Sequence, residues 1–539
     1  MELKAAPERE APLCEWIESG LRQIAGQDPL GLQTITTDRI LPALLPGILA
    51  LSVRARYFSI YPFLVRRYQE RAGTASNEAL DDFIREREFE LCVAFNLCDR
   101  CDADSAIGNQ KVRSLVASHP AQYERTRSIK TRLGGYGLYY RGPLEELGMI
   151  IPAGAATLGE ETTPIDIIAR SERAAEVADA FESAIANTRW YRDWMHGVDP
   201  IPAEVLEELG QAACLCRLDE HRDERQAIRD LLTTASSEGR EEASEQRRRA
   251  LALLLALIDR DPEVAYDTGA LREELIETFL AEPSGKGPAA EVRAAWAAMA
   301  MRECLQDALS SVWVHFCRAG LACQPFEGMT RGDLTELVRT ELIGEGEITI
   351  DEVRIQSDPD EPAKSWLGNI RDAAGSLGWE ELRGTAVEAD DALSGLAILT
   401  TLVERVPDPG AVSSAWTRVG AEDGEHQRGL LGTAALVRSE LAHEPTVQDL
   451  MSWLLNTLVI PVHETVAMGK LPESTFRFWR EEGRLRFVDN GVWRFEPSGL
   501  RRGALSSISA DIGWWEWDED DTPVLTPDGR TVVAEVFGK

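Results

Sequence analysis

Lysine is scarce in this chain, and long apolar runs are missing. The chain has 57 basic residues, and all but seven of them are arginines. Arginine binds carboxylates and phosphates through a planar fork, although a GC-rich genome produces the same bias without a physical purpose. The longest apolar run, residues 250–258, is far shorter than the ~20 residues that cross a bilayer, so no membrane span is expected. The lysines are Lys4, Lys111, Lys130, Lys286, Lys364, Lys470 and Lys539.

Signatures of catalysis are missing as well. The chain contains neither the HExxH pattern of zinc peptidases nor the GxSxG turn of serine hydrolases. The glycines at 134, 135 and 137 do not continue into a dinucleotide-binding spacing, because Tyr140 stands where the last glycine would be. The sequence therefore leans towards a protein that is not an enzyme.

One tetrapeptide invites an enzymatic interpretation. Residues 26–29, GQDP, resemble the water-activating motif of uracil-DNA glycosylases, in which Asp28 would take the acid role. In that family the motif follows a buried strand. Here it follows the amphipathic segment PLCEWIESGLRQIAG, so we do not adopt the relation.

The composition is that of an acidic globular protein. Hydrophobic residues make up 44% and charged residues 27%, with a net charge of -34 and a pI near 4.7. Nine cysteines are scattered through a long chain, which favours reduced thiols inside a cell. The start, MELKAAPEREAPLCEW, has neither a basic nor an apolar stretch of the secretory type. We expect a cytoplasmic bacterial protein that does not bind membranes.

The predicted fold is mainly α, in several domains. Residues 1–150 are expected to form a mostly helical domain with basic and aromatic segments. Residues 151–445 are expected to form an acidic all-α body, with a Gly/Pro/Asp-rich connection near 357–388. Residues 446–539 predict a small α+β module of winged-helix type, with two helices and then a hairpin in RLRFVDNGVWRFEP that turns at Asn490 and Gly491.

An apolar helix carrying arginines is predicted at residues 51–71, LSVRARYFSIYPFLVRRYQER. Tyr57 and Tyr68 fall on its core stripe, and Pro62 should kink the helix or start a second one. Arg54 and Arg56 then lie near buried surroundings and need an anionic partner. That partner is either an internal carboxylate or a ligand such as a phosphate.

The most basic stretch, residues 111–141, predicts a nucleic-acid contact. Positive charges follow a phosphate backbone, tyrosines can stack on bases, and glycines allow close approach. The alternative is a surface loop whose arginines pair with the acidic helices. The candidate residues are Arg125, Arg127, Lys130, Arg132, Tyr136, Tyr139 and Arg141.

A second basic set lies in the tail. In a winged helix, Arg477 and Arg480 would lie on the groove-facing helix, and Arg484 and Arg486 on the wing. These side chains could reach phosphates.

Two cysteine clusters suggest zinc at first sight. One is CVAFNLCDRC, with Cys92, Cys98 and Cys101, and the other is CLCRLDEH, with Cys214, Cys216 and His221. A tetrahedral site needs four ligands, usually two close pairs, and neither cluster supplies its own second pair. No metal and no cofactor are therefore expected.

Three hypotheses for function follow. The first is a nucleic-acid-associated protein, most simply DNA-binding, that acts in a larger complex with protein partners, for example in bacterial genome defence against viruses or in DNA maintenance. The second is an enzyme whose dispersed site uses Arg54, Arg56 and Arg141 to clamp an anionic substrate. The third is an acidic helical scaffold that docks a basic protein partner.

Overall fold

The computed structural model describes residues 28–538, apart from 72–75, 156–161, 197–198, 236–238, 345, 389–390, 425–427, 472–474, 493 and 496. It is mainly helical, at 63% helix, with a few small antiparallel sheets of two strands each. The predicted fold class is thus confirmed at the level of a mainly helical protein. Within the described ranges, no helix combines the length and the apolar character needed to cross a bilayer.

The chain divides into two compact units, each built from segments that are distant in sequence. Unit 1 comprises Met1–Leu41 and Arg272–Leu500, and unit 2 comprises Pro42–Leu271 and Arg501–Lys539. The boundaries predicted near residues 150 and 445 lie inside unit 2 and unit 1. Three helices span the points where the chain passes from one unit to the other: α3 (Leu41–Leu44), α12 (Thr268–Leu280) and η9 (Gly499–Arg501).

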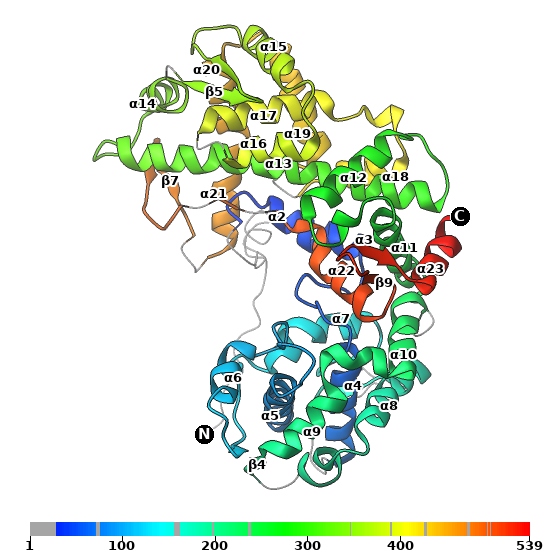
Figure 1. Cartoon of the computed structure of the whole chain (residues 1–539). Helices are drawn as coiled ribbons and strands as arrows, with labels where there is room; N and C mark the ends of the chain where they lie inside the picture. Colours follow the sequence, from blue (N-terminus) through cyan, green and yellow to red (C-terminus); the bar gives the residue numbers. More distant parts are fainter. Residues whose placement is uncertain are drawn as a thin grey trace. The chain divides into compact units, whose positions relative to one another are not determined.

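Unit 2 is a cluster of helices with three short antiparallel strand pairs. Figure 1 shows α4, α5, α8, α9 and α10 gathered together, and α4 packs on α8 while α5 packs on α9. Its elements are α4 (Tyr57–Arg71), α5 (Asn77–Asn96), α6 (Asn109–Val116), β1 (Gln122–Tyr123), η2 (Tyr136–Tyr140), α7 (Arg141–Glu146), β2 (Ile150–Ile151), β3 (Ile167–Ile168), α8 (Glu172–Ile185), η3 (Trp190–Trp194), β4 (Ile201–Pro202), α9 (Ala203–Ala213), η4 (Leu215–Glu220), α10 (Arg222–Thr233), α11 (Glu241–Ile258), η5 (Pro262–Ala265), α22 (Arg502–Asp511), β9 (Trp515–Trp517), β10 (Pro523–Leu525) and α23 (Pro527–Phe537).

Unit 1 is organised around the long helix α13, against which α16, α17 and α18 pack (Figure 1). Alanine-rich sequence favours this helix, and Pro288 at its first position fits the fixed backbone angle of proline. The elements are α2 (Leu32–Ile35), η1 (Thr36–Ile40), α13 (Pro288–Cys323), α14 (Arg331–Leu337), η6 (Val338–Ile343), β5 (Glu347–Ile350), β6 (Val353–Gln356), α15 (Ala363–Ala374), α16 (Trp379–Glu388), α17 (Ala392–Arg405), η7 (Pro409–Ala411), α18 (Ser414–Gly420), α19 (Leu430–Leu441), α20 (Val447–Leu454), η8 (Leu455–Val459), α21 (Ile460–Gly469), β7 (Phe478–Glu481) and β8 (Arg484–Phe487).

Two local predictions are corrected. The connection expected near 357–388 contains the helices α15 and α16, because apolar residues such as Trp366 and Leu382 recur at helical spacing and are buried. In the segment 51–71, helix α4 starts at Tyr57 and continues through Pro62, so no second helix begins after Tyr61. Pro62 is the sixth residue of the helix, so the helix lacks the one hydrogen bond that its N–H would donate to the carbonyl of Phe58.

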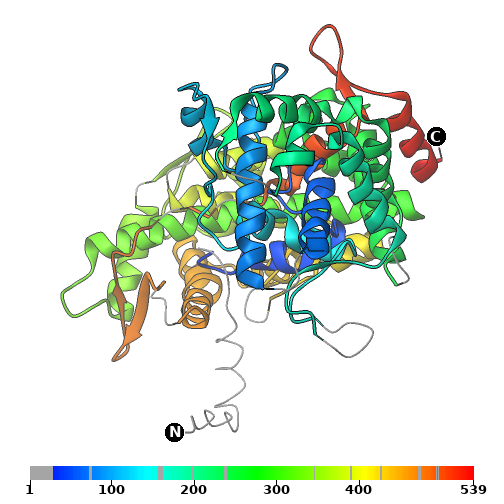
Figure 2. The same cartoon turned by 90° about the horizontal axis from the view of Figure 1, so that it is seen from below.

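The tail hairpin is displaced from its predicted position. Phe478–Glu481, expected in a helix, is strand β7, and it pairs with β8 through a two-residue turn at Glu482 and Gly483. Both turn residues have positive φ, 50° and 78°, as the tight turns that join twisted strands require. Residues 488–498, leaving aside 493 and 496, form no strand, so Asn490 and Gly491 do not join a hairpin there. Figure 2 shows β7 and β8 at the edge of unit 1.

Candidate metal centre

The two cysteine clusters meet where two helices of unit 2 end. Cys98 and Cys101 follow the last turn of α5, and Cys214 and Cys216 follow α9 and enter η4. The helices cross closely because of Gly210 on α9: a Cβ there would stand 2.2 Å from the carbonyl oxygen of Ala94. The close approach at the end of each helix brings the two pairs of thiols together.

The four sulfurs have the spacing of a metal site. The Sγ atom of Cys98 lies 3.7 Å from that of Cys216, Cys101 lies 3.5 Å from Cys214, and Cys214 lies 3.6 Å from Cys216. All four lie within 4.8 Å of one another. Zinc–sulfur bonds of ~2.3 Å in a tetrahedron place neighbouring sulfurs about 3.8 Å apart, whereas a disulfide is about 2.05 Å long. The arrangement is therefore one of four separate thiols around a common centre.

Hydrogen-bond donors also point at the sulfurs. Burial acts to raise the pKa of the Cys98 thiol, but the backbone N–H of Arg100 and the guanidinium of Arg217 act against it, and the net effect lowers this pKa. The backbone N–H of Cys216 likewise faces the sulfur of Cys214. Donors of this kind stabilise thiolates, which are the form that binds a metal.

The thiols of Cys214 and Cys216 are not stabilised as thiolates by the protein alone. Burial and the neighbouring thiols raise the pKa of Cys216 to about 12, and burial raises the pKa of Cys214 well above its ordinary value. A divalent cation at the centre would favour the deprotonated form of all four, because a coordinated thiol loses its proton. The donor set thus fits a soft or borderline metal such as zinc.

Arg56 fixes the backbone of the loop that carries Cys214 through hydrogen bonds. This guanidinium is fully buried, donates to the carbonyl of Cys214 at 2.6 Å and to that of Ala212 at 2.9 Å, and pairs with Glu224 at 2.8 Å. Arg56 therefore has an internal partner, and it positions a candidate ligand. His221, part of the second cluster in sequence, is not a member of the four-sulfur set: its Nε2 contacts the carbonyl of Ala212 at 2.9 Å.

Neither cluster supplies a second pair of its own, but the fold brings the two clusters together, so that each supplies the second pair for the other. Residues Asp102–Ala213 separate the two pairs in the sequence, so local spacing could not connect them. The signal that could have connected them is the presence of a CxxC and a CxC pair in one chain.

Two further arginines of the predicted anion sites are paired internally. Arg54 forms a two-pronged contact with Asp511, with both nitrogen–oxygen distances at 2.9 Å. Arg141 pairs with Asp166 at 2.6 and 3.0 Å. The dispersed enzyme site required Arg54, Arg56 and Arg141 to converge on unpaired carboxylates, whereas each of the three has a carboxylate of its own.

The glycine–tyrosine segment is largely core. Tyr136 and Tyr140 are buried, and Tyr139 is half-buried. The glycines let the backbone approach the buried carboxylate of Glu88, to which the N–H groups of Gly135 and Tyr136 donate at 3.0 and 2.7 Å. Tyr136 and Tyr140 are therefore placed for packing.

The basic residues before this segment differ from one another. Arg125 donates to the buried Glu90 at 2.6 Å, and Arg127 pairs with Asp82. Lys130 and Arg132 are exposed, and neither forms an ion pair with any residue that the structure describes. Among the four basic candidates of this stretch, Lys130 and Arg132 are thus the two without an ion pair to a described residue.

The basic residues of the tail lie on the β7–β8 hairpin or just before it. Arg477 precedes β7 and donates to the carbonyl of Thr475 at 2.7 Å. The other three are partly exposed and each has an acidic neighbour: Arg480 with Glu464, Arg484 with Glu327, and Arg486 with Glu481.

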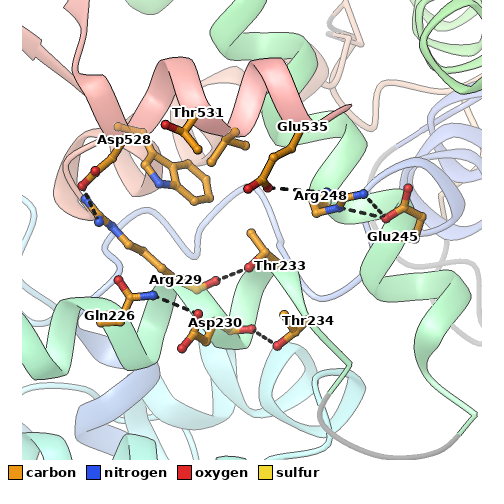
Figure 3. Close-up of a pocket in the computed structure, with 12 residues that line it drawn as sticks. Gln226, Arg229, Asp230, Thr233, Thr234, Glu245, Arg248, Asp528, Thr531 and Glu535 are labelled. Atoms are coloured by element: carbon orange, nitrogen blue, oxygen red, sulfur yellow. Dashed lines mark hydrogen bonds and ion pairs between the residues drawn. The ribbon is translucent and has the colours of Figure 1, made fainter. Parts of the chain in front are cut away.

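A separate pocket of about 570 Å³ lies in unit 2, lined by α10, α11 and α23 (Figure 3). Its two arginines are already paired, Arg229 with Asp528 at 2.6 Å and Arg248 with Glu245 at 2.8 Å. Because these charges are compensated, the pocket indicates no particular ligand.

Asp28 of the GQDP segment forms hydrogen bonds to the backbone that follows it. Its carboxylate is buried and accepts from the backbone N–H groups of Leu30 and Thr34, at 3.2 and 3.0 Å, beside the short helix α2. Gly26 and Gln27 lie outside the described residues.

Comparison of the chain with family models, with curated proteins and with solved structures finds no match. The metal site is therefore argued from the positions of the four sulfurs alone.

Proposed function

We propose that this protein binds one zinc ion through Cys98, Cys101, Cys214 and Cys216, and that the ion acts as a structural cross-link of unit 2. The observation that carries the proposal is the set of four sulfurs within 4.8 Å of one another. Four sulfur ligands complete a tetrahedron and leave no open position for substrate, which is typical of structural and not of catalytic zinc.

The ion would tie the end of α5 to the end of α9. A four-thiolate zinc centre carries two negative charges, and the guanidiniums of Arg100 and Arg217 lie beside it. Both are also held by carboxylates, Arg100 by Asp219 at 2.6 Å and Arg217 by Asp99. The cations therefore have fixed positions and compensate part of the charge of the centre.

The metal content of the purified full-length chain tests this proposal. We expect about one zinc per chain by mass spectrometry of the metal, and loss of zinc in Cys98→Ser and Cys216→Ser. Cobalt in place of zinc should give the intense visible absorption of tetrahedral sulfur coordination. The matched control is Cys323→Ser, which removes an exposed cysteine outside the cluster. A chain that contains no metal after growth with zinc, and takes up no cobalt, would refute the proposal; iron in its place would change the identity of the metal and keep the site.

Association with nucleic acid is a second candidate function. What supports it is the pair Lys130 and Arg132, exposed and without an ion pair among the described residues. The partly exposed Arg480, Arg484 and Arg486 on the β7–β8 hairpin could add a second contact, as in the predicted winged-helix-like module. Binding to DNA and RNA measured over a range of salt concentrations tests this function. Each phosphate contact adds about one unit to the slope of log affinity against log salt concentration.

A further inference from the structure

The four sulfurs of the candidate metal centre differ in exposure. Cys98 and Cys214 are buried, whereas Cys101 and Cys216 are half-buried and reach towards solvent. The short contacts that link the two helix ends each join one sulfur of each kind: Cys216 with Cys98 at 3.7 Å, and Cys101 with Cys214 at 3.5 Å. Every accessible sulfur thus has a protected sulfur of the other helix end beside it.

We propose that this centre is also a site of reversible oxidation, at which a hydroperoxide converts the four zinc-bound thiolates into two disulfides, Cys98–Cys216 and Cys101–Cys214, with release of the ion. The inference rests on the proposed zinc site. It makes the cross-link between α5 and α9 exchangeable: a metal holds the helix ends under reducing conditions and two disulfides hold them after oxidation.

The chemistry balances for each pair. The half-buried thiolate attacks one oxygen of the peroxide and becomes a sulfenic acid, and the other oxygen leaves as hydroxide, or as alkoxide from an organic peroxide. The buried thiolate then attacks the sulfenic sulfur, the S–S bond forms, and hydroxide leaves. Each disulfide gives two electrons to one peroxide molecule, so two peroxide molecules oxidise the centre and release one Zn²⁺.

Two short sulfur contacts join the two helix ends and share no sulfur, so both bonds of this pairing can form at once. A disulfide requires the two sulfurs to approach from about 3.6 Å to about 2.05 Å, a small movement for side chains at the ends of helices. A bond between Cys214 and Cys216 would join residues separated only by Leu215 and would leave the two helix ends unlinked. The cross-paired product keeps the packing of α5 on α9.

The test treats zinc-loaded full-length protein with small excesses of hydrogen peroxide. Released zinc is read with a chromogenic chelator, and disulfides are mapped by mass spectrometry of peptides without reduction. We expect one zinc released for every two peroxide molecules consumed, and the peptide pairs Cys98–Cys216 and Cys101–Cys214. Dithiothreitol with added zinc should restore the metal content.

Variants separate this site from ordinary thiol oxidation. Cys216→Ser should leave only the Cys101–Cys214 link, and Cys323→Ser should behave as the native chain because Cys323 is exposed and outside the cluster. Three results would overturn the proposal: zinc that stays bound under peroxide, disulfides Cys98–Cys101 and Cys214–Cys216, or sulfinic acids at Cys101 and Cys216 without disulfides. A protein that contains no metal before treatment would instead refute the proposed zinc site. The metal content before peroxide is added tests the zinc site, and the disulfides mapped after treatment test the oxidation, so the two failures are distinguishable.

Discussion

The buried Glu88 site and the partly buried four-cysteine centre both lie in unit 2, and they are satisfied in different ways. At Glu88 the protein supplies the donors: the N–H groups of Gly135 and Tyr136, and the hydroxyl of Tyr61 at 2.9 Å. At the four-cysteine centre the sulfurs mainly face one another. The carboxylate therefore needs no ligand, whereas the thiols reach their charged form together only when a cation joins them.

Glycine allows the close approach at both sites. A Cβ on Gly134 would stand 2.1 Å from the Glu88 carboxylate, and one on Gly210 would stand 2.2 Å from the carbonyl of Ala94. At the first site glycine brings backbone donors to a charge, and at the second it brings two helix ends together. A glycine beside a charged or sulfur-rich segment thus indicates close packing and does not distinguish a ligand site from a structural one.

Removal of zinc should have the largest effect. A ligand at 1,000 times its dissociation constant stabilises the state that binds it by about 4 kcal/mol, and a structural zinc can exceed this. We expect a strong chelator, or Cys98→Ser, to lower the free energy of unfolding of unit 2 by at least ~4 kcal/mol. Urea unfolding followed by circular dichroism measures this, with Cys323→Ser as the control.

The Glu88 site should respond to pH instead of to metal. Burial raises the pKa of Glu88 from 4.5 to about 7, with the Gly135 and Tyr136 N–H groups and Tyr61 acting against it. The folded state keeps a proton that the unfolded state has released, so the contribution of this group favours folding below pH 4.5 and is lost as the pH rises through about 7. The loss is about 3 kcal/mol, at about 1.4 kcal/mol per pKa unit.

The comparison of Glu88→Gln with the native chain measures that loss. The amide cannot ionise, so the fall in unfolding free energy between pH 5 and pH 8 should be smaller in the variant, and its zinc content should be unchanged. Equal pH profiles for the two proteins would show that the carboxyl of Glu88 is not the group that titrates.

The close crossing of α5 and α9 gives a smaller effect. Gly210→Ala should push the helices apart and lower the unfolding free energy by about 1–3 kcal/mol, as overpacking in a core does. It should also weaken zinc affinity, because the two cysteine pairs separate. Gly142→Ala is the matched control, since nothing lies within 4 Å of the added methyl group. If both variants bind zinc equally well, the crossing does not set the geometry of the centre.

Helical content was predictable from sequence because apolar spacing is a local property. The register of the tail hairpin was not, because two turns compete there: Asn490–Gly491 has the stronger local preference, yet β8 pairs with β7, and its Phe487 packs on Phe316 of α13. Tertiary packing decided between two locally acceptable turns.

The candidate sites were predictable only in part. The need of Arg54 and Arg56 for anionic partners follows from their apolar surroundings, but which carboxylate lies beside them depends on the fold, since Asp511 and Glu224 are far along the chain. For the same reason, local spacing in the sequence could not show that the pair Cys98 and Cys101 lies beside the pair Cys214 and Cys216. Residue type indicates what chemistry a position needs, and only the fold shows what supplies it.

The smallest effect on stability is expected for Lys130→Ala combined with Arg132→Ala. Exposed side chains without described ion pairs contribute within about 0.5 kcal/mol, so the free energy of unfolding and the zinc content should not change. If these residues contact two phosphates of duplex DNA, the slope of log affinity against log salt should fall by about 1.8. The control, Lys286→Ala with Lys364→Ala, makes the same charge change on exposed residues of unit 1. An equal fall in both variants would mean that binding follows net charge, and the basic pair of unit 2 would then have no specific role.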